Sequence, residues 1–232
     1  MNIGRTKGSI ITSVIAKDRP RITVELGGYV GYSALLFGSA AREACPGAQY
    51  YSIERHPLFA AISMVVLELA GLLSGTVHVV LGSSAESLRR LYAEGCFMGE
   101  KIDLLFLDHW KPSYVTDLKL AEELGLVSEG TILAADNVVR PGNPPYLEYV
   151  RSTVAEKLAR MRKSSGCEAS SAVGSQERQR VPTDVDARIV QGNPQLVYES
   201  ELVRGFDPTG QPDGVEITRC VDVEPEKGLE GW

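Results

Sequence analysis

The sequence predicts an α/β fold in which a mostly parallel sheet is covered by helices on both faces. Apolar, strand-like runs alternate with helical patterns from about residue 9 to 151. The apolar runs are nearly continuous, which is typical of strands buried on both faces of a parallel sheet. Two more strand-like runs near the C-terminus are separated by a turn rich in proline and glycine, which predicts an antiparallel hairpin at one sheet edge.

The elements follow in order along the chain. The first helix should end before Pro20, because proline cannot continue a helix. Strand runs such as RITVEL and KIDLLFLD are short and apolar, whereas the pattern at 57–73 is long enough for a helix whose Ala, Ile, Met, Val and Leu side chains face inward. The expected strands are residues 21–26, 50–54, 76–82, 101–108, 130–137, 196–203 and 214–223. The expected helices are residues 9–16, 33–44, 57–73, 84–92, 114–126 and 146–162.

The composition changes sharply after the last of these helices. From residue 163 to 194 Ser, Gly, Gln, Glu, Arg and Asp dominate and apolar periodicity disappears. We therefore expect a core over 1–162, a disordered insertion over 163–194, a hairpin over 195–223 that completes the sheet, and a loose tail over 224–232.

Charge and composition exclude several classes of protein. The 232 residues carry a formal net charge of −6, so nucleic acid is not expected as a partner. No stretch approaches the roughly 20 apolar residues of a membrane span, and the start lacks the features of a signal peptide. The four cysteines form no CxxC pair. This spacing argues against a disulfide scaffold or a zinc finger and favours a reducing, cytoplasmic location.

The ends of the first two strands carry a nucleotide-binding pattern. In such sheets ligands bind beyond the carboxyl ends of the strands. Gly27, Gly28 and Gly31 allow a tight turn and a close approach of a ligand to the backbone, although their spacing is neither GxGxxG nor a P-loop. Glu54 ends the second strand, where a carboxylate suits two ribose hydroxyls. These features favour a nucleoside ligand and do not separate NAD from S-adenosylmethionine.

The ends of the fourth and fifth strands carry a second, oxygen-rich pattern. FLDHWK and ADN bring Asp108, Asp136 and Asn137 to one edge of the sheet. Taken singly these residues suit a helix cap and a turn, but two neighbouring carboxylates repel unless a cation lies between them, and hard oxygen ligands suit Mg²⁺. Lys111 is near enough to accept a proton there. Trp110 is either the wall of an aromatic pocket or a loop anchor.

The segments MNIGRTKGSII, VELGGYVGYSA, SIERHP, FLDHWK and ADNVVRPG closely resemble the catechol O-methyltransferase family, in the same order and spacing, over about residues 1–151. The resemblance implies the Rossmann-like class I methyltransferase fold, with a seven-stranded sheet that ends in an antiparallel pair. It also implies S-adenosylmethionine and Mg²⁺ as cofactors and a small-molecule catechol as substrate. The implied reaction moves the cofactor's methyl group to one catechol hydroxyl.

The resemblance also assigns roles to individual residues. It implies metal ligation by Asp108, Asp136 and Asn137 and a general base at Lys111. The substrate-binding residues implied are Trp110, Lys111, Asn137, Pro141 and Glu216. The cofactor-binding residues implied are Ile3, Glu25, Gly27, Tyr29, Ser33, Glu54, Ser84, Asp108 and His109.

Two departures from the family leave alternatives open. The family has helices before the MNxG segment, and it lacks the insertion at 163–194. Without that helical cover, Ile3 is expected on a fraying terminus, and the chain could be a nucleoside-binding homologue with little or no turnover. A second alternative is a metal-dependent enzyme for another vicinal diphenol. An NAD oxidoreductase leaves FLDHWK and ADN unexplained. We expect a monomer.

Overall fold

The computed structural model describes residues 2–167 and 190–225. Its strands are β1 (Ile22–Leu26), β2 (Gln49–Glu54), β3 (Val77–Leu81), β4 (Leu104–Leu107), β5 (Ile132–Ala135), β6 (Leu196–Phe206) and β7 (Pro212–Val223). Its helices are α1 (Gly4–Asp18), α2 (Tyr32–Ala44), α3 (Pro57–Leu69), α4 (Ser84–Ala93), α5 (Tyr114–Glu123), α6 (Pro144–Val150) and α7 (Val154–Cys167). Two short helical segments lie at Lys111–Ser113 and Val138–Gly142.

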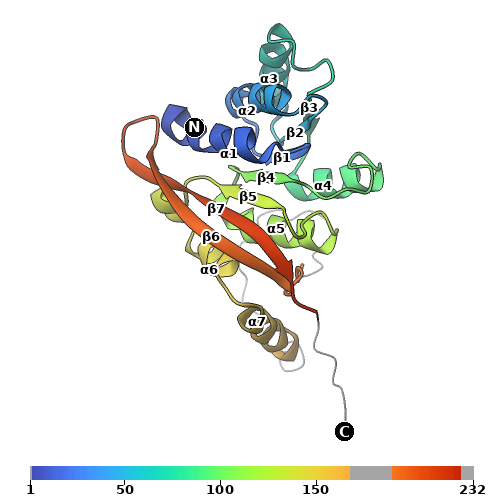
Figure 1. Cartoon of the computed structure of the whole chain (residues 1–232), viewed down its shortest axis with the longest axis vertical. Coiled ribbons are helices and arrows are strands. Elements are labelled where there is room, and N and C mark those ends of the chain that lie inside the picture. Colours follow the sequence, from blue (N-terminus) through green and yellow to red (C-terminus); the bar gives the residue numbers. More distant parts are fainter. Residues whose placement is uncertain (1, 168–189, 226–232) are drawn as a thin grey trace, which may run out of the picture.

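These strands form one seven-stranded sheet in the order β3-β2-β1-β4-β5-β7-β6 (Figure 1). Strands β1 to β5 pair in parallel. Strand β7 is antiparallel to both of its neighbours, β5 and β6, and forms the long hairpin seen in Figure 1. The predicted mostly parallel sheet with an antiparallel C-terminal hairpin is therefore confirmed.

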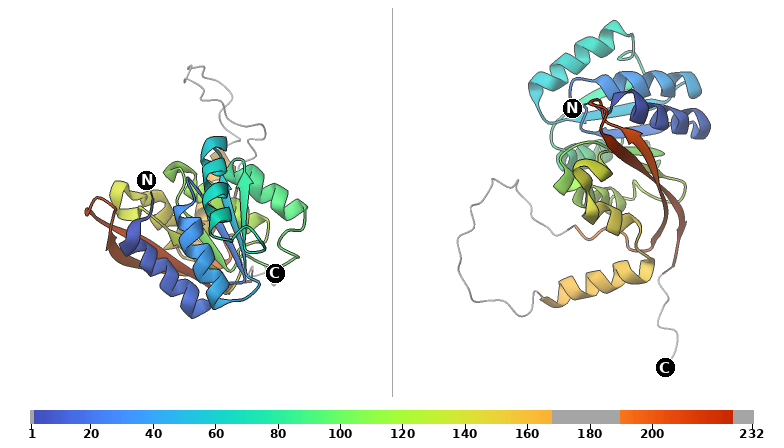
Figure 2. Two further views of the ribbon diagram at one scale, coloured as in Figure 1. Left: turned by 90° about the horizontal axis from the view of Figure 1, so that it is seen from above. Right: turned by 90° about the vertical axis from the view of Figure 1, so that its left-hand side faces the viewer.

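Two apolar layers hold the helices on the sheet. Helices α1, α2 and α3 pack on one face, and α4, α5 and α6 pack on the other (Figure 2). On the first face the rings of Phe37 and Phe106 meet edge to face, with centroids 5.2 Å apart. On the second, Tyr114 of α5 meets Tyr146 of α6 in the same way at 5.7 Å. Burial on both faces explains why the central strands are continuous apolar runs.

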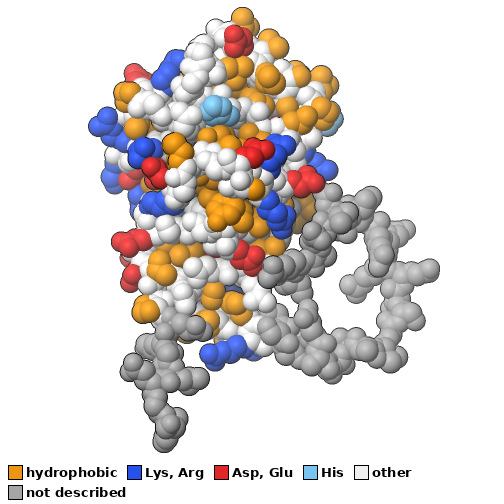
Figure 3. Space-filling model, turned by 90° about the vertical axis from the view of Figure 1, so that its right-hand side faces the viewer, with side chains coloured by type: hydrophobic (Ala, Val, Ile, Leu, Met, Phe, Trp, Pro, Cys, Tyr) orange, Lys and Arg blue, Asp and Glu red, His pale blue; other side chains and the backbone are white. Residues whose placement is uncertain are grey.

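Helix α3 differs from the expected inward-facing helix over 57–73. It ends at Leu69, and much of its apolar surface faces outward: Leu58 is 59% exposed, Val65 61% and Leu69 85%. Only one side of a surface helix can face the sheet, and in α3 this side carries Ala60 and Leu67. The apolar side chains on the remaining sides of α3 are therefore left exposed. Figure 3 shows hydrophobic side chains gathered at this end of the molecule.

Helix α1 begins at Gly4, five residues earlier than expected. Its first turns are anchored by Ile3 and Lys7, both inaccessible to solvent. Apolar periodicity missed this start because a lysine does not count as a core residue. The expected fraying of Ile3 is also wrong, since its side chain packs in the same apolar layer as Ile11 and Phe37.

The single helix expected over 146–162 is two helices. Helix α6 ends at Val150, and Thr153 starts α7 by a capping box with Glu156, each side chain accepting from the other's backbone N–H. Helix α7 runs beyond 162 to Cys167, into the expected insertion. Residues 168–189 of that insertion and 226–232 of the expected tail lie outside the described residues. On the C-terminal side of these residues the chain is described again from residue 190, and the backbone N–H of Gln191 donates to the Glu123 carboxylate.

Three features relate to the classes of protein that composition argued against: membrane-spanning helices, surface charge and cysteine pairing. Among the described residues no helix is long and apolar enough to cross a membrane. Acidic and basic side chains are interspersed on the face shown in Figure 3, where they form no patch of one sign. Cys45, Cys96 and Cys220 are free thiols.

Candidate functional site

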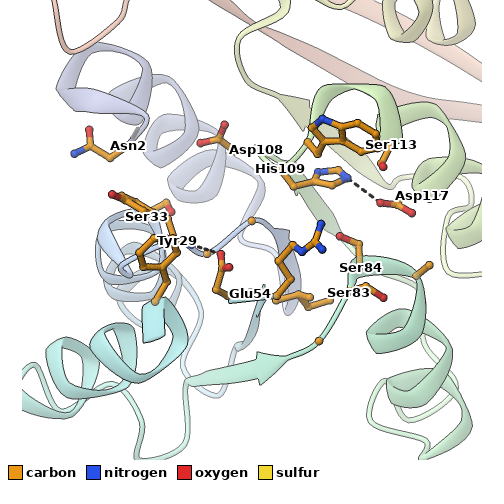
Figure 4. Close-up of a pocket in the computed structure, with 18 of the residues that line it drawn as sticks. Asn2, Tyr29, Ser33, Glu54, Ser83, Ser84, Asp108, His109, Ser113 and Asp117 are labelled. Carbon is orange, nitrogen blue, oxygen red and sulfur yellow. Dashed lines mark hydrogen bonds and ion pairs between the residues drawn. The ribbon is translucent and has the colours of Figure 1, made fainter. Parts of the chain in front are cut away.

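A cavity of about 460 Å³ opens at the carboxyl ends of β1, β2, β3 and β4 (Figure 4). It lies beside the point where the strand order reverses between β1 and β4, the usual ligand position in such sheets. Predicted residues that line it are Gly27, Tyr29, Ser33, Glu54, Ser84, Asp108, His109 and Trp110. Lining residues that the sequence reading did not single out include Asn2, Tyr32, Phe59, Ser83, Ser113 and Asp117.

The turn between β1 and α2 requires glycine where it contacts the end of β4. Gly27 has a φ of +100°, and a Cβ there would lie 2.6 Å from the backbone oxygen of Asp108. The N–H groups of Gly27 and Gly28 both donate to the Ile53 carbonyl, at 2.9 and 3.0 Å. This turn therefore joins the ends of three neighbouring strands at the floor of the cavity.

Glu54 is held by the backbone at the end of β2. Its Oε2 accepts from the N–H of Tyr29 at 2.8 Å, and its Oε1 accepts from the N–H of His56 at 2.7 Å. The Tyr29 ring packs edge to face on Phe59, with centroids 4.7 Å apart. A carboxylate has about four acceptor positions, so two remain for donors from a ligand.

Glu25 lies beneath the glycine turn rather than in the cavity wall. It is inaccessible to solvent, and Ser52 donates to its Oε2 at 2.5 Å. Its Oε1 is buried without a hydrogen-bond partner among the described residues. Burial raises the pKa of Glu25 to about 7, against the lowering effect of hydrogen bonds from Ser33 and Ser52. Because Glu25 is inaccessible and does not line the cavity, it is placed to act on a ligand through its charge rather than by direct contact.

His109 closes another side of the cavity. Its Nε2 lies 2.8 Å from Asp117 Oδ2, and a dashed line marks this contact in Figure 4. Its ring stacks on Tyr114 with centroids 4.8 Å apart and planes 13° apart. These contacts fix the imidazole, so His109 serves as a wall of the cavity. Trp110 also lines the cavity but is 68% exposed.

Two carboxylates meet where β4 and β5 end. Burial, followed by repulsion from Asp136, raises the pKa of Asp108 to about 7, although Lys111 opposes the shift. Burial also raises the pKa of Asp136. Lys111 Nζ lies 3.3 Å from Asp108 Oδ1 and donates to the Tyr114 hydroxyl at 2.6 Å. This edge of the sheet therefore concentrates acceptor oxygens beside the amine of Lys111.

A buried lysine that the sequence reading missed lies between Asp136 and a third carboxylate. Lys7 Nζ is 2.7 Å from Asp136 Oδ1 and 2.6 Å from Asp213 Oδ2. Asp213 also accepts from the side-chain amide of Asn137 at 3.0 Å and from the N–H of Arg140 at 2.9 Å. Burial opposes the charge on Lys7, but Asp136 and Asp213 outweigh it and raise the pKa of the amine.

Besides Glu25, Lys111, Asp136 and Asn137, three further predicted site residues do not line the cavity. Glu216 is inaccessible, and both of its oxygens are bound by Arg151, at 2.7 and 2.8 Å, so the structure does not bring it to the site. Ile3 is in the core, next to Asn2, which does line the cavity. Pro141 is exposed in Val138–Gly142, the segment that follows Asn137.

Asp108, Asp136 and Asn137 are the residues here that could hold a metal. The described residues contain no group of three or more His, Cys, Asp and Glu side chains placed to bind one. Two carboxylates and one amide oxygen remain a suitable donor set for a hard cation, which takes its other ligands from water or substrate. Burial and then repulsion from Asp136 raise the pKa of Asp108, and such a cation would relieve the repulsion.

The sequence model of a family described as O-methyltransferase matches residues 1–164. Catechol O-methyltransferase of Bos taurus is 44% identical over 151 residues, which cover 65% of this chain and 53% of that protein. That of Sus scrofa is 42% identical and is covered over 78% of its length. The chain spans about half the length of several curated relatives it matches, including the Mus musculus protein at 56%.

Solved structures share the fold. An O-methyltransferase from Bacillus cereus in complex with SAH superposes with a TM-score of 0.63 and 20% identity, covering 94% of this chain and 82% of that one. The O-methyltransferase TomG from Streptomyces achromogenes, in complex with SAM, gives a TM-score of 0.59 and 19% identity, covering 92% and 79%. At these identities the likeness concerns the fold alone.

Proposed function

The chain belongs to the O-methyltransferase family, as its motifs indicated, and from that premise we propose that it methylates a catechol. The methyl group would come from S-adenosylmethionine and pass to one of two adjacent hydroxyls, with a divalent cation, Mg²⁺, at the acidic edge of the sheet. The observation that carries the proposal is the position of Asp108, which belongs both to the wall of the 460 Å³ cavity and to the acidic edge. At that edge, where β4 and β5 end, it lies close enough to Asp136 for the two carboxylates to repel each other.

The cavity fits the cofactor in two respects. Glu54 keeps two acceptor positions for the ribose hydroxyls, because only one backbone N–H occupies each of its oxygens. Near the glycine turn, Asp108 lines the cavity and suits the ammonium group of the methionine part, and buried Glu25 beneath the turn adds negative charge without lining the cavity. His109, stacked on Tyr114, would form a flat wall beside the nucleoside.

At the acidic edge, Asp108, Asp136 and the carbonyl oxygen of Asn137 would hold Mg²⁺. When bound, the cation lowers the pKa of a catechol hydroxyl that contacts it. Lys111, positioned by Tyr114 and Asp108, would accept the hydroxyl proton at Nζ. Trp110 would cover one face of the aromatic ring. The oxygen would then attack the cofactor's methyl group in line, so that the O–C bond forms as the S–C bond breaks and S-adenosylhomocysteine leaves. Alignment of the two bound substrates would supply much of the rate.

Methyl transfer from labelled S-adenosylmethionine to a simple catechol tests the proposal. We expect product with Mg²⁺ and a loss of at least 10²-fold after chelation, with cofactor binding retained. Monophenols such as phenol should be poor substrates, because only a vicinal pair offers two oxygens to one cation. Equal turnover in chelator would refute the metal, and cofactor binding without product from any diphenol would refute the enzyme.

We also propose a monomer in the cytoplasm. The free thiols of Cys45, Cys96 and Cys220 support a reducing compartment. Light scattering of the purified chain measures its oligomeric state, and a dimer at micromolar concentration would contradict this part of the proposal.

A further inference from the structure

Lys7 and Asp213 form a buried ion pair behind the acidic edge. They lie 206 residues apart in sequence, on α1 and β7, and their side chains are inaccessible to solvent. Burying two charges costs free energy that an ion pair recovers only with good geometry and further hydrogen bonds. Both side chains do have further contacts, and most of these reach Asp136 or the segment after it.

Asp213 orients the amide of Asn137. Its Oδ2 accepts from Asn137 Nδ2 at 3.0 Å, so the nitrogen end of the amide is directed to β7 and the oxygen end is left for another partner. Its Oδ1 accepts from the N–H of Arg140 at 2.9 Å. The same carboxylate therefore also fixes the backbone after Asn137, which itself adopts a left-handed conformation with φ 59°.

Lys7 restrains Asp136, the residue before Asn137. Its ammonium lies 2.7 Å from Asp136 Oδ1, which directs that oxygen toward α1 and leaves Oδ2 for a second partner. Lys7 and Asp213 together thus set the orientation of both Asp136 and Asn137.

We propose that Lys7 and Asp213 are positioning residues that hold Asp136 and Asn137 ready to bind a divalent cation. The inference rests on the proposed function, since it assumes that these two residues ligate the metal. Outer partners of this kind orient ligands at metal sites, and their loss costs about 10- to 100-fold in metal affinity. Neither residue contacts the cation or the substrate.

The test is Mn²⁺ binding, measured by the electron paramagnetic resonance of free Mn²⁺. We expect Asp213→Asn to weaken binding at least tenfold, because an amide cannot accept from all three donors. The double variant Lys7→Met/Asp213→Asn removes one charge of each sign and leaves the net charge unchanged. Neither Lys7 nor Asp213 is then left buried with an uncompensated charge, although Asp136 loses its ammonium neighbour. Cation binding should also weaken at least tenfold, whereas a purely electrostatic role predicts affinity equal to or above that of the wild type, because the positive charge nearest Asp136 is removed.

A matched control comes from a second ion pair between the same two elements. Arg219 of β7 contacts Asp18 of α1 at 2.8 and 3.0 Å, at the far end of the helix from Lys7. Asp18→Asn should lower the free energy of unfolding while leaving Mn²⁺ affinity within twofold of wild type. S-adenosylhomocysteine affinity, measured by calorimetry, should stay within about threefold in every variant.

The outcomes separate the two proposals. Wild-type Mn²⁺ affinity in both Asp213 variants would overturn the positioning role and leave the metal site standing. An equal loss in Asp18→Asn would overturn it as well, because docking of α1 on β7 would then be the cause. If the wild-type chain binds no Mn²⁺, the metal dependence in the proposed function fails, and the positioning role fails with it.

Discussion

Lys111 Nζ lies 2.6 Å from the hydroxyl oxygen of Tyr114 and 4.7 Å from the centroid of the same ring. The hydroxyl in turn donates to the backbone carbonyl of Leu107 at 2.8 Å, so its lone pairs are directed to the amine. A lysine side chain has much rotational freedom, and this contact confines the amine to the edge of the cavity.

Lys111→Ala should therefore reduce methyl transfer to a catechol by roughly 10²-fold or more, the usual scale for a general base. Cofactor affinity should change little, because Lys111 does not line the cavity wall. Lys119→Ala is the matched control, since Lys119 lies on α5 and lines a different cavity. Initial rates at saturating cofactor decide the matter. Turnover within a factor of three of wild type would show that Lys111 is only a loop residue.

Glu54→Gln tests the ribose contact. Two backbone N–H groups need an oxygen each, so the new amide nitrogen must face one of those donors or a ribose hydroxyl. We expect the affinity for S-adenosylhomocysteine to fall by about 1–2 kcal/mol. Calorimetry measures it, with Glu68→Gln on the outer side of α3 as a control expected to bind as wild type. Unchanged affinity would show that Glu54 does not bind the ribose hydroxyls.

Gly27 and Gly47 offer a matched pair for the glycine turn. Both have positive φ, +100° and +88°, but a Cβ at Gly47 meets nothing within 4 Å, whereas one at Gly27 meets the backbone of Asp108 and His109. Gly47→Ala should cost about 1–2 kcal/mol of stability from backbone strain. Gly27→Ala should cost about 1–3 kcal/mol more from overpacking and should weaken cofactor binding. Equal losses in urea denaturation would show that the close approach is unimportant.

Stability of the cofactor-free chain should depend on pH through Glu25. Its pKa is about 7 in the folded state against 4.5 ordinarily, so between these values the folded state holds more protons than the unfolded one. The free energy of unfolding therefore falls as pH rises from 4.5 to 7 and levels off above. Glu25→Gln removes this titration.

The difference in unfolding free energy, wild type minus Glu25→Gln, should decrease by on the order of 2–3 kcal/mol from pH 4.5 to 7.5. Urea denaturation at four pH values measures it, with exposed Glu43→Gln as the control whose difference from wild type stays constant. Parallel curves for wild type and Glu25→Gln would place the ordinary pKa on Glu25.

The sheet could be predicted well because parallel strands buried on both faces appear in the sequence as continuous apolar runs. Continuous apolar runs such as LLFL of β4 have few other interpretations, and the residues just after them had to meet at one edge. The glycine turn, Glu54 and Asp108 all line one cavity as that argument requires.

Other features depend on contacts that local sequence does not encode. The burial of Lys7 is decided by Asp136 and Asp213, which only the folded sheet brings to it. The resemblance to the family implied a substrate-binding role for Glu216, in the segment VEI. Its direction is set instead by pairing of β7 with β5, opposite Ala135, which turns the side chain toward Arg151. A register of this kind cannot be read without knowing the neighbouring strand.

The ion pair between Lys7 and Asp213 also determines when the acidic edge can be completed during protein synthesis, because its two residues lie near opposite ends of the chain. The ribosome has made every residue that lines the cavity once it reaches Asp117, and both predicted carboxylate ligands once it reaches Asp136. Asp213, which fixes Asn137 and Lys7, arrives only with the last strand. A nascent or truncated chain that stops before β7 therefore contains Lys7 and all the lining of the cofactor cavity but lacks Asp213, the carboxylate that holds Asn137 at the acidic edge.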